Sequence, residues 1–408
     1  MGREWTKSQI EEILASRGLT YQEVKLPFGL STGGTDRTET ARAIIPKDMK
    51  GKSVFDLGCM YGFFCFEAEE AGAQRILGVD IEAVNVETCR ILADIRGSKA
   101  EFRQMDIEID PMPGQFDYVF CLNVLHHMRN PLAVLEKLIA ATRECLILEV
   151  ASLGRGDRRK LSMPVWSAAM LRNFPVIYVS NAAGKKKGSN ELFYFTQAAI
   201  KNLLGQHRRV FSSIEIRASG HKNGRFIVIA RKRQVDRLVV VAGPTSAGKS
   251  TLIKNLEQGK VPAIAKAVGI EATADWVSAG LTTLGDFDQS GKRNLILHYD
   301  ITRRQFGNPI ARSQYDLHDL IGLANQVTFL TIEAPRERLR VQHEVAMQQP
   351  DEAGHRAGTA KHEKITEMYK RTDVVDSLYE QWYATTDRYK AAHFTVPASD
   401  SGEISRRS

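Results

Sequence analysis

The residue types and spacing with the clearest chemical meaning lie in the segment Gly243-Pro-Thr-Ser-Ala-Gly-Lys-Ser-Thr251. Gly243 and Gly248 allow backbone conformations that are closed to residues with side chains, so that consecutive N–H groups can point at phosphate oxygens. Lys249 would place its ammonium on the β- and γ-phosphates, and the Ser250 hydroxyl would ligate Mg²⁺. The segment therefore predicts a P-loop that binds ATP or GTP with Mg²⁺.

The flanking segments support the same interpretation. Leu238 to Ala242 is an apolar, β-branched run that predicts a buried strand, and the residues from Ser250 onward predict a helix with Thr251 in its first turn. The N-terminus of such a helix presents a partial positive charge to an anion. The alternative is a chance match of a glycine- and serine-rich turn, against which this strand–loop–helix context argues.

A carboxylate ends the next apolar run, Asn294-Leu-Ile-Leu-His-Tyr-Asp300. This pattern predicts a buried parallel strand that delivers an acid to the metal. Asp300 is therefore the candidate Mg²⁺-linked or catalytic carboxylate of this half. The alternative is that Asp300 caps the following segment.

Val327 to Ile332 predicts another strand, and Glu333-Ala-Pro-Arg-Glu-Arg-Leu-Arg340 predicts an arginine-rich helix that starts at a proline. This arrangement resembles small P-loop kinases of the nucleoside-monophosphate kinase type, and the resemblance implies a mobile basic lid at about 348–364. Arg356 and Lys361 are basic residues of that segment, although solvation alone would also explain them. The loop spelling also resembles guanylate kinases and tRNA isopentenyltransferases, at the phosphate site alone. Further on, Tyr379 to Tyr389 predicts an amphipathic helix, followed by a strand at 392–396 and a disordered tail at 399–408.

The first half of the chain carries a different glycine pattern. A strand from Ser53 breaks at Gly58 and Gly62 in the order D-x-G-x-x-x-G, where the acid is Asp56. A second strand, Ile76-Leu-Gly-Val-Asp80, also ends in an acid. Gln104-Met-Asp106 and the run Phe116–His127 follow, and this alternation fits a doubly wound parallel sheet whose ligands lie beyond the carboxyl ends of the strands.

These motifs resemble class I S-adenosylmethionine-dependent methyltransferases. The resemblance implies that the Asp56 segment with Gly58 and Gly62 lets the backbone approach the amino-acid part of S-adenosylmethionine, and that Asp80 accepts both ribose hydroxyls. It also implies that Asp106 faces the adenine amine and that Asn123 lies beside the methionine moiety. Met60 stands where the family commonly has a middle glycine. A nicotinamide site is the alternative, which the G-x-x-x-G spacing disfavours.

Two closer likenesses compete within that superfamily. The stretch from about Lys52 to Ala151 resembles the methyltransferase domain of O-antigen chain-terminating kinase–methyltransferases, which phosphorylate a glycan end and then methylate the phosphate. Their kinase half resembles protein kinases, whereas the second half here carries a P-loop. Residues 116–132 also resemble tRNA wobble-uridine carboxymethyltransferases. The first likeness implies a polysaccharide or glycolipid acceptor, and the second implies tRNA.

His126 and His127 are candidates for a catalytic base, because imidazole titrates near neutral pH and can accept a proton from a hydroxyl nucleophile. A structural role at the end of a strand is the alternative for both.

Composition sets outer limits. The chain has 408 residues, of which 43% are hydrophobic, and its formal net charge is +8, enough for two sizeable cores and for attraction to an anionic partner. No apolar run reaches the roughly 20 residues that cross a bilayer, and no signal-peptide region is evident, which predicts a cytoplasmic protein with the option of peripheral membrane attachment. The five cysteines lack metal-binding spacing and are expected to be reduced core thiols. Clustered basic residues favour RNA, an anionic membrane surface, a phosphorylated substrate or plain solvated charge; they are Arg155–Lys160, Lys185–Lys187, His207–Arg209 and Arg231–Arg233.

The sequence thus predicts an α/β chain with two doubly wound parallel-sheet domains. The expected divisions are a leader and lid at 1–50 with a helix around Ser8–Arg17, a methyltransferase domain at 51–233 and a kinase-like P-loop domain at 237–398. A helix near Thr196–Leu204 and strands at 213–217 and 226–230 would complete the first sheet. The most concrete hypothesis is a bifunctional enzyme for methyl and phosphoryl transfer. A tRNA-modifying enzyme and a methyltransferase regulated by a non-transferring nucleotide-binding domain are the alternatives, and the oligomeric state is left open.

Overall fold

The computed structural model divides the chain into two compact units. The first unit comprises Met1–Gln206 and Ser213–Lys232, and the second comprises His207–Ser212 and Arg233–Ser408. The change of unit at Lys232 falls within a few residues of the predicted domain boundary. The structure describes residues 4–152, 171, 173–179, 192–207, 209–220, 224–302, 310–348, 360–371, 373–398 and 403–407.

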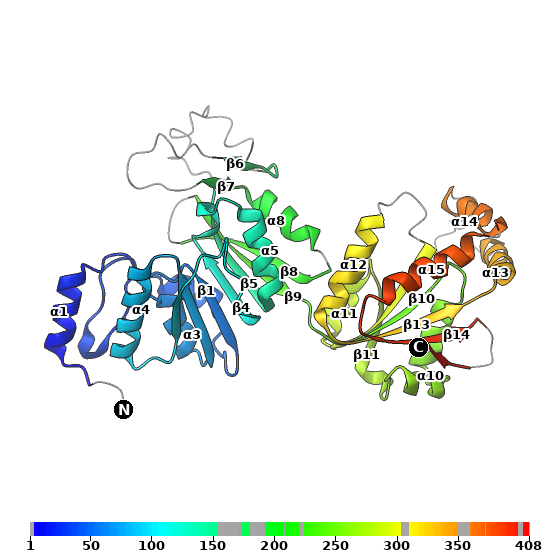
Figure 1. Ribbon diagram of the computed structural model, residues 1–408, viewed down its shortest axis with the longest axis horizontal. Coiled ribbons are helices and arrows are strands. Elements are labelled where there is room, and N and C mark those ends of the chain that lie inside the picture. Colours follow the sequence, from blue (N-terminus) through cyan, green and yellow to red (C-terminus); the bar gives the residue numbers. More distant parts are fainter. Residues whose placement is uncertain are drawn as a thin grey trace. The chain divides into compact units, whose positions relative to one another are not determined.

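The first unit alternates strands and helices along most of its length (Figure 1, blue to green). Its strands are β1 (Ser53–Leu57), β2 (Arg75–Asp80), β3 (Glu101–Gln104), β4 (Phe116–Leu122), β5 (Thr142–Ala151), β6 (Ile177–Val179), β7 (Phe193–Phe195), β8 (Phe211–Ala218) and β9 (Arg225–Lys232). Its helices are α1 (Lys7–Arg17), η1 (Pro27–Gly29), α2 (Thr38–Ile44), α3 (Phe63–Glu70), α4 (Ala83–Arg96), η2 (Leu125–His127), α5 (Pro131–Ala141) and α8 (Gln197–Gln206). The strands and helices predicted for this half are all present, with ends shifted by a few residues.

The described residues form one large sheet in this unit, with the strand order β3-β2-β1-β4-β5-β9-β8. The strands β1 to β5 are parallel to their neighbours, and β9 runs antiparallel to β5, with Arg225 opposite Ala151. The carboxyl ends of β1 to β5 and the first residue of β9 therefore meet at one edge. This is the edge at which doubly wound sheets bind their ligands.

Local sequence explains where several helices begin and end. Thr6 and Gln9 form a capping box at the start of α1, and Gly18 ends that helix in the left-handed conformation. Asn130 caps α5, whose first residue is Pro131. The helices α3, α4 and α5 pack on the strands β1 to β5 and bury their apolar faces there.

The second unit repeats the strand–helix alternation (Figure 1, light green to red). Its strands are β10 (Val235–Gly243), β11 (Trp276–Gly280), β12 (Asn294–Asp300), β13 (Ala324–Glu333), β14 (Ala392–Pro397) and β15 (Ser405–Arg406). Its helices are α9 (Lys249–Glu257), α10 (Pro262–Ala267), η4 (Thr273–Asp275), α11 (Leu284–Ser290), α12 (Ile310–Leu323), α13 (Arg336–Gln348), α14 (Ala360–Lys370) and α15 (Val374–Thr386).

The sheet of the second unit has the order β11-β12-β10-β13-β14-β15. The central strand β10 pairs in parallel with β12 and with β13, and Gly243 lies directly opposite Asp300. Two sequence predictions need correction here. The helix expected at 379–389 begins earlier, at Val374, because Val374, Val375 and Leu378 are buried at helical spacing. The tail is not disordered throughout, since Ser405–Arg406 pairs antiparallel with β14.

The five cysteines are free and buried in the first unit, as the sequence predicted. Within the described ranges, no group of histidine, cysteine and acidic side chains has an arrangement that could hold a metal ion. None of the helices in the described part of the chain combines the length and apolar composition needed to span a bilayer.

Candidate functional site

The loop after β1 has an unusual backbone. Gly58, Met60 and Gly62 have φ angles of +73°, +52° and +79°, in the left-handed region. A Cβ on Gly58 would lie 2.4 Å from the Cγ2 methyl of Val124, so that a larger residue there would force Val124 or the loop to shift. The N–H group of Gly58 donates to the carbonyl oxygen of Val79 at 2.8 Å, which holds the loop against β2.

Asp80, at the end of β2, is held by three donors and is 5% exposed. The N–H of Met60 donates to Oδ2 at 3.2 Å, and the N–H of Glu82 donates to Oδ1 at 3.0 Å. The side-chain amide of Asn85 also donates to Oδ1, at 3.1 Å. A carboxylate has about four acceptor positions, so Asp80 keeps capacity for a hydroxyl donor.

Asp56 is buried at the end of β1 and accepts a hydrogen bond from the Cys65 thiol at 3.6 Å. The pKa of Asp56 is raised to about 7, chiefly by burial; the Cys65 thiol and the Arg37 guanidinium lower this pKa, and the nearby charge of Asp80 raises it. Asp56 therefore exchanges its proton near neutral pH. Burial also raises the pKa of the Cys65 thiol, which stays protonated.

Asp106 and Asn123 lie at the same edge. Met105 N–H donates to the carbonyl oxygen of Asp80 at 3.0 Å, which places Asp106 directly beyond β3 and beside β2. One oxygen of Asp106 accepts the N–H of Glu108 at 2.9 Å. Asn123 follows β4 with a φ of +66°, in the left-handed region. The structure thus brings Asp56, Gly58, Gly62, Asp80, Asp106 and Asn123 to the ends of adjacent strands.

The two histidines differ in exposure. His126 is fully buried, and its Nε2 lies 3.3 Å from the Arg225 guanidinium, so burial favours the structural alternative for this residue. His127 is exposed in η2, and its ring centroid lies 4.3 Å from that of His126. His127 stays a candidate base.

Sequence reasoning missed an acid at the centre of this edge. Glu149 on β5 is 0% exposed, and it accepts hydrogen bonds from Arg37, from the Asn123 amide and from the Ser219 hydroxyl. Arg225 in turn donates to the side-chain oxygen Oδ1 of Asn123. The available signal was a charged residue inside the apolar run of a predicted strand, since such a residue is buried only with partners.

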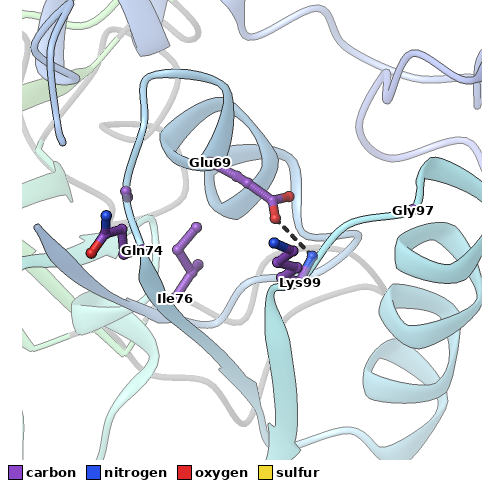
Figure 2. A pocket seen from close by; sticks show the side chains of 6 residues that line it. Glu69, Gln74, Ile76, Gly97 and Lys99 are labelled. Carbon is purple, nitrogen blue, oxygen red and sulfur yellow. Dashed lines mark hydrogen bonds between the residues drawn. The ribbon is translucent and has the colours of Figure 1, made fainter. Parts of the chain in front are cut away.

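A surface pocket of about 440 Å³ lies elsewhere on the first unit, at the amino end of β2. Its lining comes from the end of α3, the residues before β2 and the turn after α4. Figure 2 shows Glu69 turned toward Lys99, whose backbone N–H donates to the Glu69 carboxylate at 2.7 Å. Because this is the opposite end of the parallel strands, the pocket is not part of the site formed by the loop after β1.

The loop between β10 and α9 is the corresponding feature of the second unit. Gly248 has a φ of +95°, as expected, but the other residue of this loop with a positive φ is Ser246, at +67°. The expectation of a left-handed conformation at Gly243 is therefore wrong. Gly243 is needed for close approach instead, because a Cβ there would lie 3.2 Å from the Ile332 carbonyl oxygen.

Lys249 follows that loop as the first residue of α9, and Asp300 lies opposite Gly243 at the end of the neighbouring strand β12. The Lys249 ammonium is 4% exposed and donates to the carbonyl oxygens of Gly243 and Pro244 at 2.9 and 2.6 Å. Asp300 accepts the Thr245 hydroxyl at 2.7 Å and the N–H of Thr302 at 2.9 Å. Burial alone would raise the pKa of Asp300, but the Lys249 charge and these hydrogen bonds lower it below its ordinary value. The carboxylate is therefore ionised.

Ser250 and Thr251 are exposed in the first turn of α9. The Ser250 hydroxyl lies 3.4 Å from Nε2 of His298, which is two residues before Asp300 and hence on the same face of β12. Two further contacts come from α13 and α14: the His343 ring lies 3.2 Å from the Ser246 hydroxyl, and the Tyr369 hydroxyl donates to the Thr245 carbonyl at 2.5 Å. No sequence pattern indicated either contact, since His343 and Tyr369 are distant in the chain from the loop after β10.

Basic residues expected on the surface are partly buried in ion pairs. Arg209 pairs with Asp316 at 3.2 Å, and Arg233 pairs with Asp288 at 2.7 Å. These two arginines are 8% and 5% exposed, so they do not form a surface for an anionic partner. The clusters Arg155–Lys160 and Lys185–Lys187 and most of the predicted lid, including Arg356, lie outside the described residues, as does the side chain of Lys361.

Comparison with known proteins shows that the first unit is similar to methyltransferases. Residues 48–187 match the family described as "Methyltransferase domain". A tRNA U34 carboxymethyltransferase of Idiomarina loihiensis is 31% identical over 132 residues, which cover 31% of this chain and 41% of that protein. A ubiquinone biosynthesis O-methyltransferase of Bordetella parapertussis is 28% identical over 129 residues, 31% of this chain and 53% of that protein. The chain thus spans about half or less of the length of these curated relatives.

Among solved structures, the N-terminal domain of EvdMO1, crystallised in the presence of SAH and D-fucose, is similar to 56% of this chain and 98% of that chain, with 18% identity and a TM-score of 0.43. The family match falls on the segment that carries the glycine loop after β1 and the acids at the ends of β1, β2 and β3. The first unit therefore contains a methyltransferase domain.

Proposed function

We propose that the first unit binds S-adenosylmethionine at the carboxyl ends of β1 to β4 and transfers its methyl group to an acceptor. The observation that carries the proposal is the restrained Asp80 carboxylate beside a loop with three left-handed residues. Asp80 keeps acceptor capacity for the ribose, and Asn85 is a side-chain donor that can rotate away to make room for the second hydroxyl. Gly58 and Gly62 leave the backbone open to close approach.

S-adenosylmethionine supplies an activated methyl group on a sulfonium. The chain has to orient the donor and the acceptor in line, so catalysis is mainly positioning. The Asp56 carboxylate, in its ionised form, would favour the cationic amino-acid end of the donor. Asn123 would keep the adjoining turn in place, and the exposed His127 is the candidate group to receive a proton from a hydroxyl acceptor.

We propose further that the loop from Gly243 to Lys249 binds ATP or GTP with Mg²⁺ and that the second unit transfers phosphate. Support comes from the chemistry of the residues present: a buried ammonium, Lys249, beside an ionised carboxylate, Asp300, at the N-terminus of α9. Helix N-termini and successive backbone N–H groups favour phosphate.

Lys249 is satisfied by carbonyl oxygens of its own loop, and these hydrogen bonds would be exchanged for phosphate oxygens on binding. The Ser250 hydroxyl would hold Mg²⁺, which supplies charge neutralisation at the phosphates, and Asp300 would orient its coordination shell. The Thr245 and Thr302 hydroxyls fix the Asp300 carboxylate in place.

The finer proposal concerns which molecule accepts the methyl and phosphoryl groups. A polysaccharide or glycolipid end that is first phosphorylated and then methylated would use both units in sequence. A second candidate is tRNA, and the observation that favours it is the identity with tRNA U34 carboxymethyltransferases. In a third case the second unit binds nucleotide and regulates methyl transfer without passing phosphate on.

The test is calorimetry on the intact chain with SAH and, separately, with a non-hydrolysable ATP or GTP analogue and Mg²⁺. Heat from both ligand types is expected, and heat from one alone would remove the function of the other unit. Incubation with nucleotide labelled at the γ-phosphate and with labelled S-adenosylmethionine then separates the acceptors. Label in bulk tRNA would favour the second candidate, and nucleotide binding without labelled acceptor would favour the regulatory case.

A further inference from the structure

A buried polar network connects the leader of the chain to the edge of the sheet where the methyl donor would bind. Arg37, the residue before α2, is 4% exposed and donates to Glu149 at 2.6 Å across 112 positions of sequence. The guanidinium also lies over the Phe64 ring, 5.3 Å from its centroid, and its Nε donates to the Thr40 hydroxyl at 3.4 Å. Arg37 is therefore fixed from several sides.

Glu149 in turn holds Asn123 through two hydrogen bonds. The Asn123 N–H donates to the Glu149 carbonyl oxygen at 2.9 Å, and the Asn123 side-chain amide donates to the Glu149 carboxylate. These bonds hold Asn123 at a φ of +66°, a left-handed conformation that asparagine adopts more often than most residues other than glycine. A residue held in such a conformation by its surroundings is a sign of a functional constraint.

The next residue reaches the loop after β1. Val124 packs against Gly58, so closely that a Cβ on that glycine would meet a Val124 methyl at 2.4 Å. A displaced Asn123 turn would therefore release the loop at Gly58. The path runs from Arg37 through Glu149 and Asn123 to the backbone that the methyl donor would approach.

A second contact ties the leader to the same loop. The side-chain oxygen of Gln22 accepts the N–H of Tyr61 at 3.1 Å, and Gln22 is 6% exposed. The Thr32 hydroxyl fixes this segment, since it donates to the Gln22 carbonyl at 2.5 Å and accepts the N–H of Val24 at 2.7 Å. Gln22 and Arg37 thus anchor the leader at two points, Gln22 directly on the loop after β1 and Arg37 on Glu149.

A buried ion pair is a poor device for stability alone, because the desolvation of two charges offsets most of their attraction. An apolar pair of similar volume would hold the leader at least as well. The Arg37–Glu149 pair therefore serves a purpose other than stability.

We propose that Arg37 is a positioning residue for the donor site: acting through Glu149, it holds the Asn123–Val124 turn and thereby the Gly58 loop in the conformation that binds S-adenosylmethionine. The leader is then part of the donor site, and its docking and donor binding stabilise each other. This inference rests on the function proposed for the first unit.

The test compares Arg37→Met with the double variant Arg37→Met/Glu149→Leu. The single variant leaves a buried carboxylate without its cation and should lower both the melting temperature and SAH affinity. The double variant replaces the ion pair by apolar side chains and should recover most of the melting temperature. Because Asn123 has then lost its carboxylate partner, SAH affinity should stay about tenfold or more below that of the wild type.

Arg17→Met is the matched control, since Arg17 lies in the same leader and pairs with the exposed Glu87 at 2.8 Å. It should leave SAH affinity within about twofold of the wild type, because exposed pairs contribute little. Recovery of SAH affinity together with stability in the double variant would show a purely structural role and overturn the inference alone. Absence of SAH binding by the wild-type chain would overturn the proposed function, and this inference with it.

Discussion

The two candidate sites both lie in a loop between a buried strand and a helix, yet the second site places a fixed cation, Lys249, beside its carboxylate, whereas the loop after β1 is faced by carboxylates. At the loop after β1 the fixed groups are carboxylates, Asp56 and Asp80. The backbone N–H of Met60 donates to Asp80. At the loop after β10 the fixed group facing the backbone is an ammonium, Lys249. The same strand–loop–helix geometry therefore suits a hydroxyl-rich, cationic ligand in the first unit and an anion in the second.

The difference also appears in how each loop is kept in shape. The first loop needs no side-chain cation, since the N–H groups of Gly58 and Cys59 bind the Val79 carbonyl oxygen at 2.8 and 3.0 Å. The second loop is closed by Lys249, which donates to two of its carbonyl oxygens. Removal of one side chain should therefore disable the second site more completely than the first.

The largest effect is expected for Lys249→Ala. The variant loses the cation that would bind the phosphates and the two hydrogen bonds that shape the loop, so nucleotide affinity should fall by about 100-fold or more, while SAH affinity is unchanged. Calorimetry with both ligands on the full chain measures this. Lys254→Ala is the control, because Lys254 is exposed on the same helix α9. Nucleotide binding by the Lys249→Ala chain at wild-type strength would refute the anion site.

Asp80→Asn should give the converse result with a smaller magnitude. The amide keeps one acceptor oxygen but brings an NH₂ group toward one of the two N–H donors, that of Met60 or that of Glu82. Loss of hydrogen bonds to a charged acceptor costs about 1.5–3 kcal/mol, so SAH affinity should fall about 10- to 100-fold. Nucleotide affinity should not change. Glu87→Gln, an exposed acid on α4, serves as control, and a Asp80→Asn chain that binds SAH normally would exclude Asp80 from the donor site.

A pair of glycine variants sharpens the comparison of the loops. Gly248 has a φ of +95° and no atom within 4 Å of an added Cβ, so Gly248→Ala meets backbone strain alone, about 1–2 kcal/mol. Gly58→Ala adds a collision with Val124 at 2.4 Å to similar strain, and should cost about 1–3 kcal/mol more. Denaturant unfolding of both variants measures the difference. Equal losses would mean that Val124 yields easily, which would weaken the coupling proposed for Arg37.

Much of this architecture could be predicted from the sequence. The strand Asn294–Asp300 is observed with the predicted bounds, because an apolar run between polar residues specifies a buried strand and its length. The glycine-and-acid motif around Asp56 likewise predicted the loop after β1. In both cases the signal is local, since the residues that define the element are neighbours in the chain.

The contacts that refine the sites could not be predicted, because they join residues that are distant in sequence. Arg37 and Glu149 lie 112 positions apart, and Tyr369 and Thr245 lie 124 apart. Periodicity says that Glu149 is in a buried strand but not which cation meets it. The positive φ at Ser246 was also missed, since a loop with two glycines does not reveal which residue takes the left-handed conformation.

The smallest predicted effects are pH-dependent, and they differ in sign between the units. Asp56 keeps its proton to about pH 7 in the folded chain, whereas an unfolded aspartate loses it near pH 3.8. Between these values the folded state binds more protons, so the free energy of unfolding falls as pH rises. The stability advantage of the wild type over Asp56→Asn should therefore decrease by about 1 kcal/mol from pH 6 to pH 8.

His393 in the second unit has the opposite dependence, because burial lowers its pKa from 6.5 to about 4 and the unfolded state then binds more protons between these values. Its contribution to stability rises with pH over that window, and His393→Gln should remove the rise. Hydrogen exchange of peptides from β1 and from β14 at several pH values reports the two units separately. Protection of β1 should decrease from pH 6 to pH 8 in the wild type but not in Asp56→Asn, and protection of β14 should increase from pH 4.5 to pH 6.5 in the wild type but not in His393→Gln. Slopes of the same sign in both units would contradict the burial of one of the two groups.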